Sequence, residues 1–336
     1  MNTYHHKQPF TLECGTVLPE LTIAYHTFGT LNADKSNVVW VCHHLTANSN
    51  AVEWWPGMIG EGCVISPEKH FIVCANILGS CYGTTGPLNM NPKTEELYYS
   101  DFPFPTVRDI VNAHILLRKH LGLEKIHVMI GGSMGGYQAL EWCIMEKKVT
   151  DNLILLATSP AESAWGIAIH AAQRLAIEAD ITWKDRSPHA GAKGLKAARA
   201  IGMLTYRNYN IMVRNQADPD HEKIDDFKAA SYINYQGDKL VKRFNAYCYW
   251  LLTKTMDSHN IARGRDMRID QVLATVIQRT LLIGVTNDIL CPVEEQQYMV
   301  KHIPHSTLFE IESDYGHDGF MVETGKISKY IDAWLV

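Results

Sequence analysis

Two apolar patterns alternate along this chain. Short runs in which nearly every residue is apolar occupy residues 37–42, 70–78, 126–130, 152–157 and 280–285, and residues 306–312 form a further strand-like segment. Such runs predict strands that are buried on both faces of a sheet, because no side of the strand faces solvent. Near the N-terminus, residues 10–14 and 21–28 alternate between apolar and polar types, with Gly15 and Pro19 between them. This alternation predicts a β-hairpin.

Elsewhere apolar residues recur every three or four positions, which is the spacing of one face of a helix. Thr106 and Asp109 match a capping box with Asp in place of Glu, and a helix should follow as far as Gly122. His114 lies on the apolar face of that helix, so we expect it to be packed rather than catalytic. Further helices are predicted at residues 165–180, 192–206, 225–235, 239–256, 293–302 and 323–335.

The order of these elements predicts the fold class. Strands and helices alternate in residues 1–160, helical periodicity dominates residues 161–270, and the alternation returns in residues 271–336. This order is typical of an α/β protein with a mostly parallel sheet and helices on both faces. We therefore expect one α/β core, made of residues 1–160 and 271–336, with residues 161–270 inserted as a helical lid.

Composition excludes several classes of protein. The 336 residues are 46% hydrophobic and 20% charged, with a net charge of −5 and no block of Lys and Arg. Nucleic acid is therefore not expected as a partner. No apolar run approaches the ~20 residues of a membrane span, and the first residues lack the pattern of a signal peptide. We expect a cytoplasmic protein that does not enter a membrane.

The eight cysteines form no C-x-x-C pair. We expect free thiols, as in a reducing compartment, and we interpret Cys81 as a structural loop residue rather than a reactive thiol. The acidic segment 218–226 lacks the glycine and the final Glu of a calcium loop, so it is interpreted as a solvated connector. No metal ion is expected.

The sequence around Ser133 suggests a catalytic residue. Gly131, Ser133 and Gly135 match the G-x-S-x-G pattern between a predicted strand and a predicted helix. In that arrangement the serine lies at the tip of a tight turn, beyond the carboxyl end of the strand, where α/β sheets bind ligands. The alternative is a glycine-rich turn with an incidental serine. The flanking strand and helix favour Ser133 as a nucleophile.

A serine nucleophile needs a base, and the base needs an orienting acid. In sheets of the hydrolase type these follow in the order Ser, Asp or Glu, His. Asp288 comes directly after the strand 280–285, and His317 follows the strand 306–312. Each alone has an ordinary alternative, as a turn aspartate or an exposed loop histidine. His302 and His305 precede the last strand and are therefore placed at the opposite edge of the sheet.

The backbone N–H groups that would stabilise a developing oxyanion are expected at Met134, directly after the serine, and at Leu45, in the loop after the strand 37–42. The neighbouring His43 and His44 raise the question of a metal site. Adjacent residues on an extended chain point in opposite directions, and no cysteine or carboxylate cluster is near in sequence. We therefore reject a metal ion at this position.

Several longer motifs resemble the homoserine O-acetyltransferase family of α/β-hydrolase fold enzymes. They are Gly131–Gly136 with Gln138–Trp142, Cys81–Pro87, Leu204–Arg207, Ser231–Tyr232 with Tyr235–Lys239, Arg243–Phe244 and Tyr315–Phe320. The resemblance covers nearly the whole chain, including the helical segment, and is far more specific than G-x-S-x-G alone.

The resemblance implies an activity. A member of this family transfers an acetyl group from acetyl-CoA to the hydroxyl of L-homoserine, in methionine biosynthesis, by a ping-pong route through an acyl-serine. It needs no cofactor besides this co-substrate. By the family pattern Asp318 would hold the substrate amino group, and Arg199, helped by Tyr206, its carboxylate. Family members are commonly homodimers joined through the lid helices.

Two positions depart from the family pattern. Ala and Gly are common where this chain has His44 and Ala47, and the segment 46–54 is short. These residues border the expected acyl pocket, so succinyl transfer and L-serine as acceptor stay open as alternatives. A serine esterase of the same fold is the main rival from another class. A non-catalytic binding module is a third, and it predicts a missing triad member.

Overall fold

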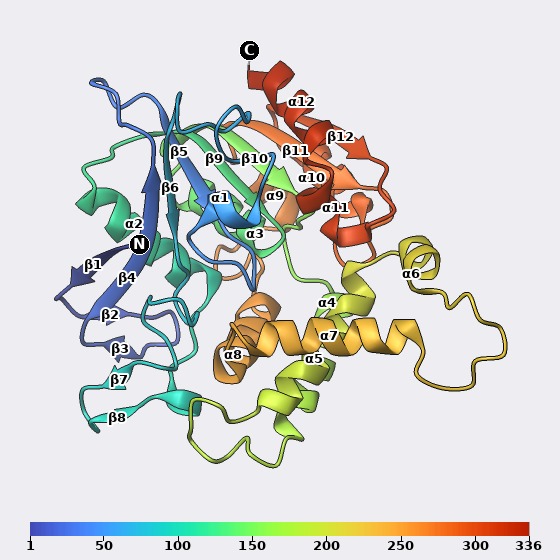
Figure 1. The fold of residues 1–336 in the computed structure, drawn as a ribbon. Coiled ribbons are helices and arrows are strands. Elements are labelled where there is room, and N and C mark those ends of the chain that lie inside the picture. The colour runs from blue at the N-terminus through green and yellow to red at the C-terminus, as the bar shows by residue number, and fades with distance from the viewer. Residues whose placement is uncertain (336) are drawn as a thin grey trace.

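A computed structural model describes residues 1–335, and an eight-stranded sheet forms its centre (Figure 1). The strand order is β1-β4-β6-β5-β9-β10-β11-β12, in which β1–β4 and β4–β6 are antiparallel and the remaining neighbours are parallel. The strands are β1 (Asn2–His6), β4 (Leu21–Phe28), β5 (Val38–Cys42), β6 (Phe71–Ala75), β9 (Ile126–Gly132), β10 (Thr150–Leu156), β11 (Arg279–Val285) and β12 (Ser306–Ile311). The predicted apolar strands and the fold class are confirmed.

Helices cover both faces of this sheet. One face carries α2 (Val107–His120), α3 (Met134–Met145), α9 (Ile269–Leu273) and α10 (Val293–His302), and the other carries α1 (Ala51–Trp54), α11 (Gly319–Val322) and α12 (Thr324–Leu335). In β5, Trp40 packs into the first layer, whereas Val39 and Val41 pack into the second. A strand that contributes to two layers must be apolar at every position, which is why this run does not alternate. None of the helices in residues 1–335 is long and apolar enough to cross a membrane.

The N-terminal hairpin was predicted with the wrong partners. β4 pairs with β1, while residues 10–18 form a separate small ladder of β2 (Phe10–Thr11) and β3 (Val17–Leu18). Gly15 has a φ of +84° and closes that ladder, so the chain turns before it reaches β4. β1 lies at the sheet edge and is mostly polar. It was not predicted, because strands were predicted from apolar residues. A second ladder joins β7 (Met90–Asn91) and β8 (Glu96–Leu97), followed by the 3₁₀ turn Tyr99–Asp101.

The helix cap predicted before α2 is confirmed. The Asp109 amide donates to the Thr106 hydroxyl at 3.3 Å, and the Thr106 amide donates to the Asp109 carboxylate at 2.8 Å. His114 is packed, as predicted, with its ring beside those of Trp40 and Trp142. Burial lowers the pKa of His114 to about 3, so its ring stays neutral.

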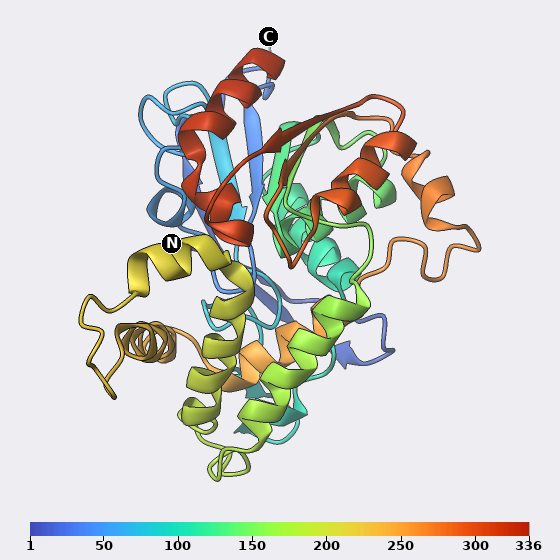
Figure 2. The same cartoon turned by 90° about the vertical axis from the view of Figure 1, so that its right-hand side faces the viewer.

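Between β10 and β11 the chain is mostly helical, and residues 161–270 of this segment are called the insertion. Its helices are α4 (Ala164–Glu178), α5 (Ala192–Tyr206), α6 (Tyr209–Gln216), α7 (Lys228–Val241) and α8 (Ala246–Asp257). The insertion lies beside the core in both views (Figures 1 and 2). Its backbone at residues 206–208 closes on Gly316, in the loop that follows β12.

The helix boundaries in the second half of the insertion differ from those expected. The break predicted between residues 235 and 239 lies instead at residues 242–245, where Asn245 caps α8. Gly237 does not end a helix. A side chain there would meet Lys196 of α5 at 2.6 Å, so glycine serves close helix packing. The helix α6 was not predicted.

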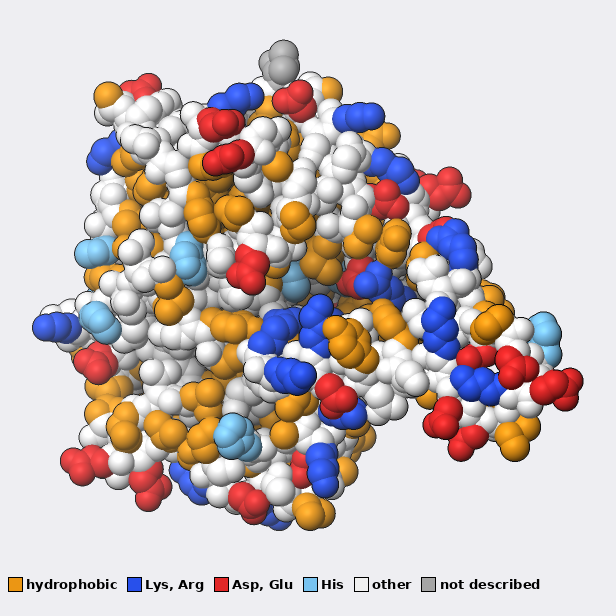
Figure 3. Space-filling model, in the orientation of Figure 1, with side chains coloured by type: hydrophobic (Ala, Val, Ile, Leu, Met, Phe, Trp, Pro, Cys, Tyr) orange, Lys and Arg blue, Asp and Glu red, His pale blue; other side chains and the backbone are white. Residues whose placement is uncertain are grey.

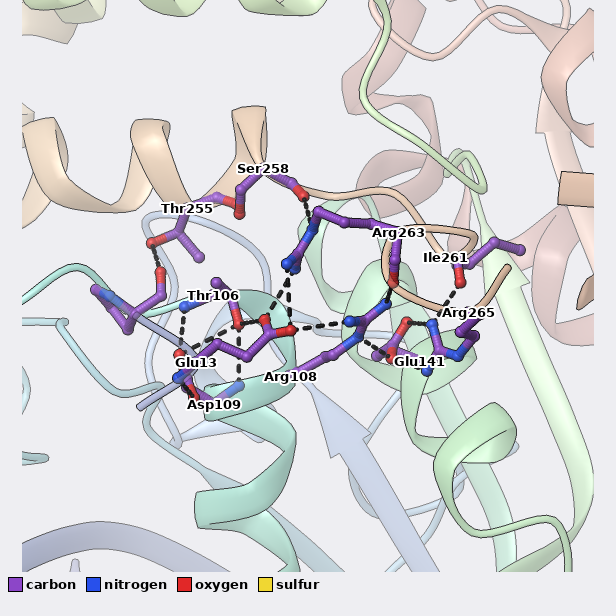
Figure 4. A network of polar contacts seen from close by, with 11 residues as sticks. Glu13, Thr106, Arg108, Asp109, Glu141, Thr255, Ser258, Ile261, Arg263 and Arg265 are labelled. Atoms are coloured by element: carbon purple, nitrogen blue, oxygen red, sulfur yellow. Dashed lines mark hydrogen bonds and ion pairs between the residues drawn. The ribbon is translucent and has the colours of Figure 1, made fainter. Parts of the chain in front are cut away.

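A polar network ties the end of the insertion to the core (Figure 4). Glu141 of α3 accepts from Arg108 at 2.8 Å and pairs with Arg265, while Glu13 accepts from Arg108 and Arg263, each at 2.8 Å. Glu141 is almost fully buried, with 2% of its side chain exposed. A carboxylate at this depth depends on its two arginines, and they in turn depend on it.

Replacing Glu141 by alanine should therefore destabilise the fold. Loss of one member of a buried ion pair leaves the other charges uncompensated, and we expect the free energy of unfolding to fall by about 3 kcal/mol or more. Glu124→Ala is the control, because that exposed side chain has no partner in the described chain, and it should change stability by less than about 0.5 kcal/mol. Urea unfolding measures both. Equal midpoints for the two variants would contradict a stabilising role of this network.

Candidate active site

Ser133 lies at the turn between β9 and α3 in a strained backbone conformation, with φ +52° and ψ −127°. The strand and helix approach each other so closely that a side chain at Gly131 would lie 2.2 Å from the Gly135 carbonyl oxygen. A side chain at Gly135 would meet the Cys42 carbonyl oxygen at 2.1 Å. The glycines of the G-x-S-x-G pattern are therefore required by packing, and the turn projects the Ser133 hydroxyl beyond the strand.

The structure brings the serine together with the two partners expected from the sequence. His317 Nε2 lies 2.9 Å from the Ser133 hydroxyl oxygen, and His317 Nδ1 lies 2.6 Å from the Asp288 carboxylate. The second Asp288 oxygen accepts from the backbone N–H groups of Leu290 at 2.7 Å and Cys291 at 2.9 Å. The carboxylate is thus held in place, and it fixes the tautomer that leaves Nε2 free to accept the serine proton.

Two opposing effects set the pKa of His317. Burial lowers it, whereas the Asp288 carboxylate raises it by charge and by hydrogen bonding, and the pKa ends above the usual 6.5. The ring is also held sterically, since the Phe320 ring lies edge-on at 5.5 Å and the Tyr206 ring lies at 6.0 Å. Tyr206 comes from the helical insertion, which therefore reaches the base directly.

The two expected oxyanion donors lie on segments that are fastened together. Gln138 Nε2 donates to the carbonyl oxygens of His43, at 3.0 Å, and Met134, at 3.1 Å. This joins the first turn of α3 to the loop that carries Leu45. Neither the Leu45 nor the Met134 backbone N–H donates to an acceptor in residues 1–335, so both are available to a ligand.

His43 and His44 do not share a ligand. His43 Nε2 accepts from the Ile77 N–H at 3.2 Å and Nδ1 lies 2.8 Å from the His44 carbonyl oxygen, so both nitrogens are used. Burial lowers the pKa of His43 to about 4 and keeps it neutral. His44 turns the other way, with its ring 5.1 Å from that of Trp54 and 6.1 Å from that of Phe320.

The three residues expected to bind substrate also lie near the triad. Asp318 directly follows His317, and burial raises the pKa of its carboxyl against the opposing effect of Arg207 and Arg199. The Arg199 guanidinium lies over the Tyr206 ring at 5.2 Å. Arg207 was not assigned a role from the sequence, although it belongs to a quoted motif, and its Nε lies 3.2 Å from the Asp318 carboxylate.

One buried group beside the triad was also missed. Cys291 offers its sulfur within 4.8 Å of ligand atoms of Asp288 and His317, and these are the only three residues in the described chain grouped closely enough to suggest a metal. Asp288 and His317 already hydrogen-bond to each other. Burial raises the pKa of the Cys291 thiol, which opposes the thiolate that a metal ion requires. The geometry fits acyl transfer better than metal binding.

Comparison with known proteins agrees with this geometry. Residues 37–324 match the family model for the alpha/beta hydrolase fold. A homoserine O-acetyltransferase from Cyclobacterium marinum is 49% identical over 95% of this chain and 91% of its own length. The chain belongs to the homoserine O-acetyltransferase family. A second member, from Chlorobaculum parvum, is 45% identical over 96% of this chain and 90% of its own length.

Solved structures extend the comparison. The homoserine O-acetyltransferase from Bacillus anthracis superposes with a TM-score of 0.91 at 25% identity, covering 99% of this chain and 96% of that one. The esterase E22 superposes with a TM-score of 0.89 at 22% identity, covering 100% of this chain and 99% of that one. At that identity the esterase shows only that the fold is shared. The family therefore uses a scaffold on which hydrolases are also built.

Replacing Asp288 by asparagine should slow acylation by roughly 10⁴-fold, as the equivalent change does in serine proteases, because the imidazole loses its tautomer and its counter-charge. Acylation in the unchanged protein should fail as pH drops through a His317 pKa above 6.5, since the protonated ring cannot accept the serine proton. In the variant this fall in rate should occur at lower pH, because the Asp288 carboxylate no longer raises the His317 pKa. Pre-steady-state thiol release from an acyl-CoA across pH 5–9 measures both. If the variant keeps both the rate of acylation and the pH at which that rate falls, Asp288 is excluded as the partner of His317.

Proposed function

We propose that this protein is a homoserine O-acetyltransferase, which moves an acetyl group from acetyl-CoA to the hydroxyl of L-homoserine in methionine biosynthesis. The observation that carries the proposal is identity of 39–49% over nearly the whole chain with homoserine O-acetyltransferases. The hydrogen-bonded chain of Ser133, His317 and Asp288 supports it, because acyl transfer needs an activated nucleophile.

The reaction follows a ping-pong route in two halves. His317 takes the proton of Ser133 as the serine oxygen attacks the thioester carbonyl, and the N–H groups of Leu45 and Met134 stabilise the oxyanion. The C–S bond breaks, His317 returns the proton to the departing thiolate, and Ser133 keeps the acetyl group. Homoserine then enters, His317 deprotonates its hydroxyl, and the same steps run in reverse to release the O-acetyl product.

Homoserine recognition is assigned to the groups at the insertion. The Asp318 carboxylate would hold the substrate ammonium group, and Arg199 would bind the substrate carboxylate, with Tyr206 beside it. In the structure Asp318 is paired with Arg207, which opposes the effect of burial on the Asp318 carboxylate before substrate arrives. The arriving ammonium group would share that carboxylate. This arrangement favours an acceptor with both charges of a free amino acid.

An acyltransferase must also keep water away from the acyl-serine. Ser133, His317 and Asp318 are each less than 9% exposed, and the chain at residues 206–208 closes over Gly316 next to the base. We therefore assign a lid role to the helical insertion. On this view a plain esterase, which must admit water, is the less suitable function for the site.

The acyl pocket favours a small donor group. The half-buried His44 ring is enclosed by Trp54 and Phe320, and Ala47 is buried nearby. Burial and nearby positive charges, including Arg199 and Arg243, lower the pKa of His44 well below 6.5 and keep it neutral. A neutral ring among aromatic side chains suits an acetyl group better than the carboxylate of a succinyl group.

We also propose that the protein is a cytoplasmic homodimer joined through the lid. All eight cysteines are free, as expected in a reducing compartment. Of the 18 exposed large hydrophobic residues in the described chain, 11 lie in residues 161–270, among them Leu175, Ile181 and Tyr209. Exposed apolar side chains concentrated in one segment support an interface between chains there. Sedimentation velocity tests this, and a monomer at micromolar concentration would contradict it.

Donor and acceptor can be tested together. The protein is given equimolar acetyl-CoA and succinyl-CoA with L-homoserine and L-serine, and products are identified by mass spectrometry. O-acetylhomoserine should dominate, because the neutral His44 ring is enclosed by aromatic side chains and the site matches that acceptor. Free thiol is measured in parallel from acetyl-CoA alone. Fast thiol release without any acceptor would indicate an esterase, and predominant O-succinylhomoserine or O-acetylserine would correct the substrate.

A further inference from the structure

A cavity of about 300 Å³ lies outside the triad, between core and insertion. Its walls come from three segments, namely residues 81–88 after β6, residues 188–195 at the start of α5, and residues 241–246 between α7 and α8. Apolar side chains such as Leu195 and Phe244 form much of the lining. The charged or titratable nitrogen groups in it are His189, Lys242 and Arg243, and no carboxylate lines it among the described residues.

The cations beside this cavity are not neutralised. Lys239, Lys242 and Arg243 are exposed at the end of α7, and none forms an ion pair with a carboxylate in residues 1–335. Lys196 of the adjacent helix α5, by contrast, pairs with Asp238 at 2.9 Å. In Figure 3, several Lys and Arg side chains lie together where the C-terminal end of α7 lies in Figure 1. Unpaired like charges repel one another, so such a cluster favours a multiply charged anion.

Arg243 connects this cluster to the acyl-transfer site. Its Nη1 donates to the Thr46 carbonyl oxygen at 2.5 Å and to the Tyr82 hydroxyl at 2.9 Å. Thr46 is the residue next to Leu45, the expected oxyanion donor. The cavity therefore begins one side chain away from the loop at which a thioester carbonyl would react.

We propose that this cavity binds the phosphate-bearing nucleotide end of the acyl-CoA donor, with Lys242 and Arg243 on its phosphates and Lys239 adding to the field. The inference rests on the proposed function for the identity of the donor. Charge-assisted contacts to phosphate account for the unpaired cations, and the apolar walls provide a surface for the aromatic base of the nucleotide. The acyl end extends past Arg243 to Ser133.

The first test compares two donors that differ in their phosphates. Acetyl-CoA and S-acetyl-N-acetylcysteamine carry the same thioester, but only the first has the nucleotide. In the double variant Lys239→Gln, Lys242→Gln, the ratio of kcat/KM for acetyl-CoA to that for the short donor should fall about tenfold, the effect of losing one charge-assisted contact. Added salt should lower the same ratio in the unchanged protein. Lys329→Gln, an exposed lysine on α12, is the matched control. An unchanged ratio in the double variant would overturn the proposal.

The second test uses binding without turnover. Cys81 lines the cavity and is partly exposed, and a hydrogen bond from Cys248 lowers its pKa against the effect of burial, so iodoacetamide labelling at mildly alkaline pH serves as a probe of the cavity. Coenzyme A should slow labelling of Cys81 and leave the exposed Cys14 unaffected. Pantetheine, which lacks the nucleotide, should protect less, and the double variant should lose the protection. Labelling is followed by peptide mass spectrometry.

The outcomes separate the two proposals. If coenzyme A protects Cys81 but no O-acetylhomoserine forms, the proposed function fails and the nucleotide site stands. If O-acetylhomoserine forms but coenzyme A does not protect Cys81, the nucleotide site is wrong and the proposed function stands. Equal protection by pantetheine and coenzyme A would likewise exclude phosphate recognition in this cavity.

Discussion

The site depends on the hydrogen bond between His317 and Asp288. A buried imidazole ordinarily loses basicity, and the aspartate reverses this by raising the pKa of His317 above its usual value. The same bond turns Nε2 toward Ser133, while backbone N–H groups from residues 290 and 291 hold the second carboxylate oxygen. One carboxylate thus sets the charge, the tautomer and the direction of the base.

Helix α3 is the common support of the elements around that bond. It begins directly after the strained serine, and Gln138 on it holds the carbonyl of the loop that carries Leu45. Three residues further on, Glu141 holds Arg108 of α2 and Arg265 of the chain that leaves the insertion. Ser133, the loop that carries Leu45 and the insertion are therefore all held by one helix. These contacts explain the two polar residues, Gln138 and Glu141, in the motif Gln138-Ala-Leu-Glu-Trp142.

Much of the core and the grouping of the triad could be predicted from the sequence, because carboxyl ends of parallel strands meet at one edge of a sheet. That rule places Ser133, Asp288 and His317 together without knowledge of side-chain packing. Features set by long-range contacts could not be predicted. The edge strand β1 is polar, Gly237 lies within α7 where it packs against Lys196, and the pairing of Arg207 with Asp318 joins segments far apart in sequence. The cavity beside Arg243 likewise arises only when insertion and core meet.

The central claim is that an acetyl group rests on Ser133 and leaves only to homoserine. A single-turnover experiment tests it most directly. The protein is mixed with acetyl-CoA, quenched at intervals, and examined by intact and peptide mass spectrometry before and after L-homoserine is added. We predict an acetyl adduct on Ser133 that persists without acceptor and passes to O-acetylhomoserine when homoserine is present. An adduct on Ser133→Ala, or decay of the adduct at the same rate with and without homoserine, would contradict the account.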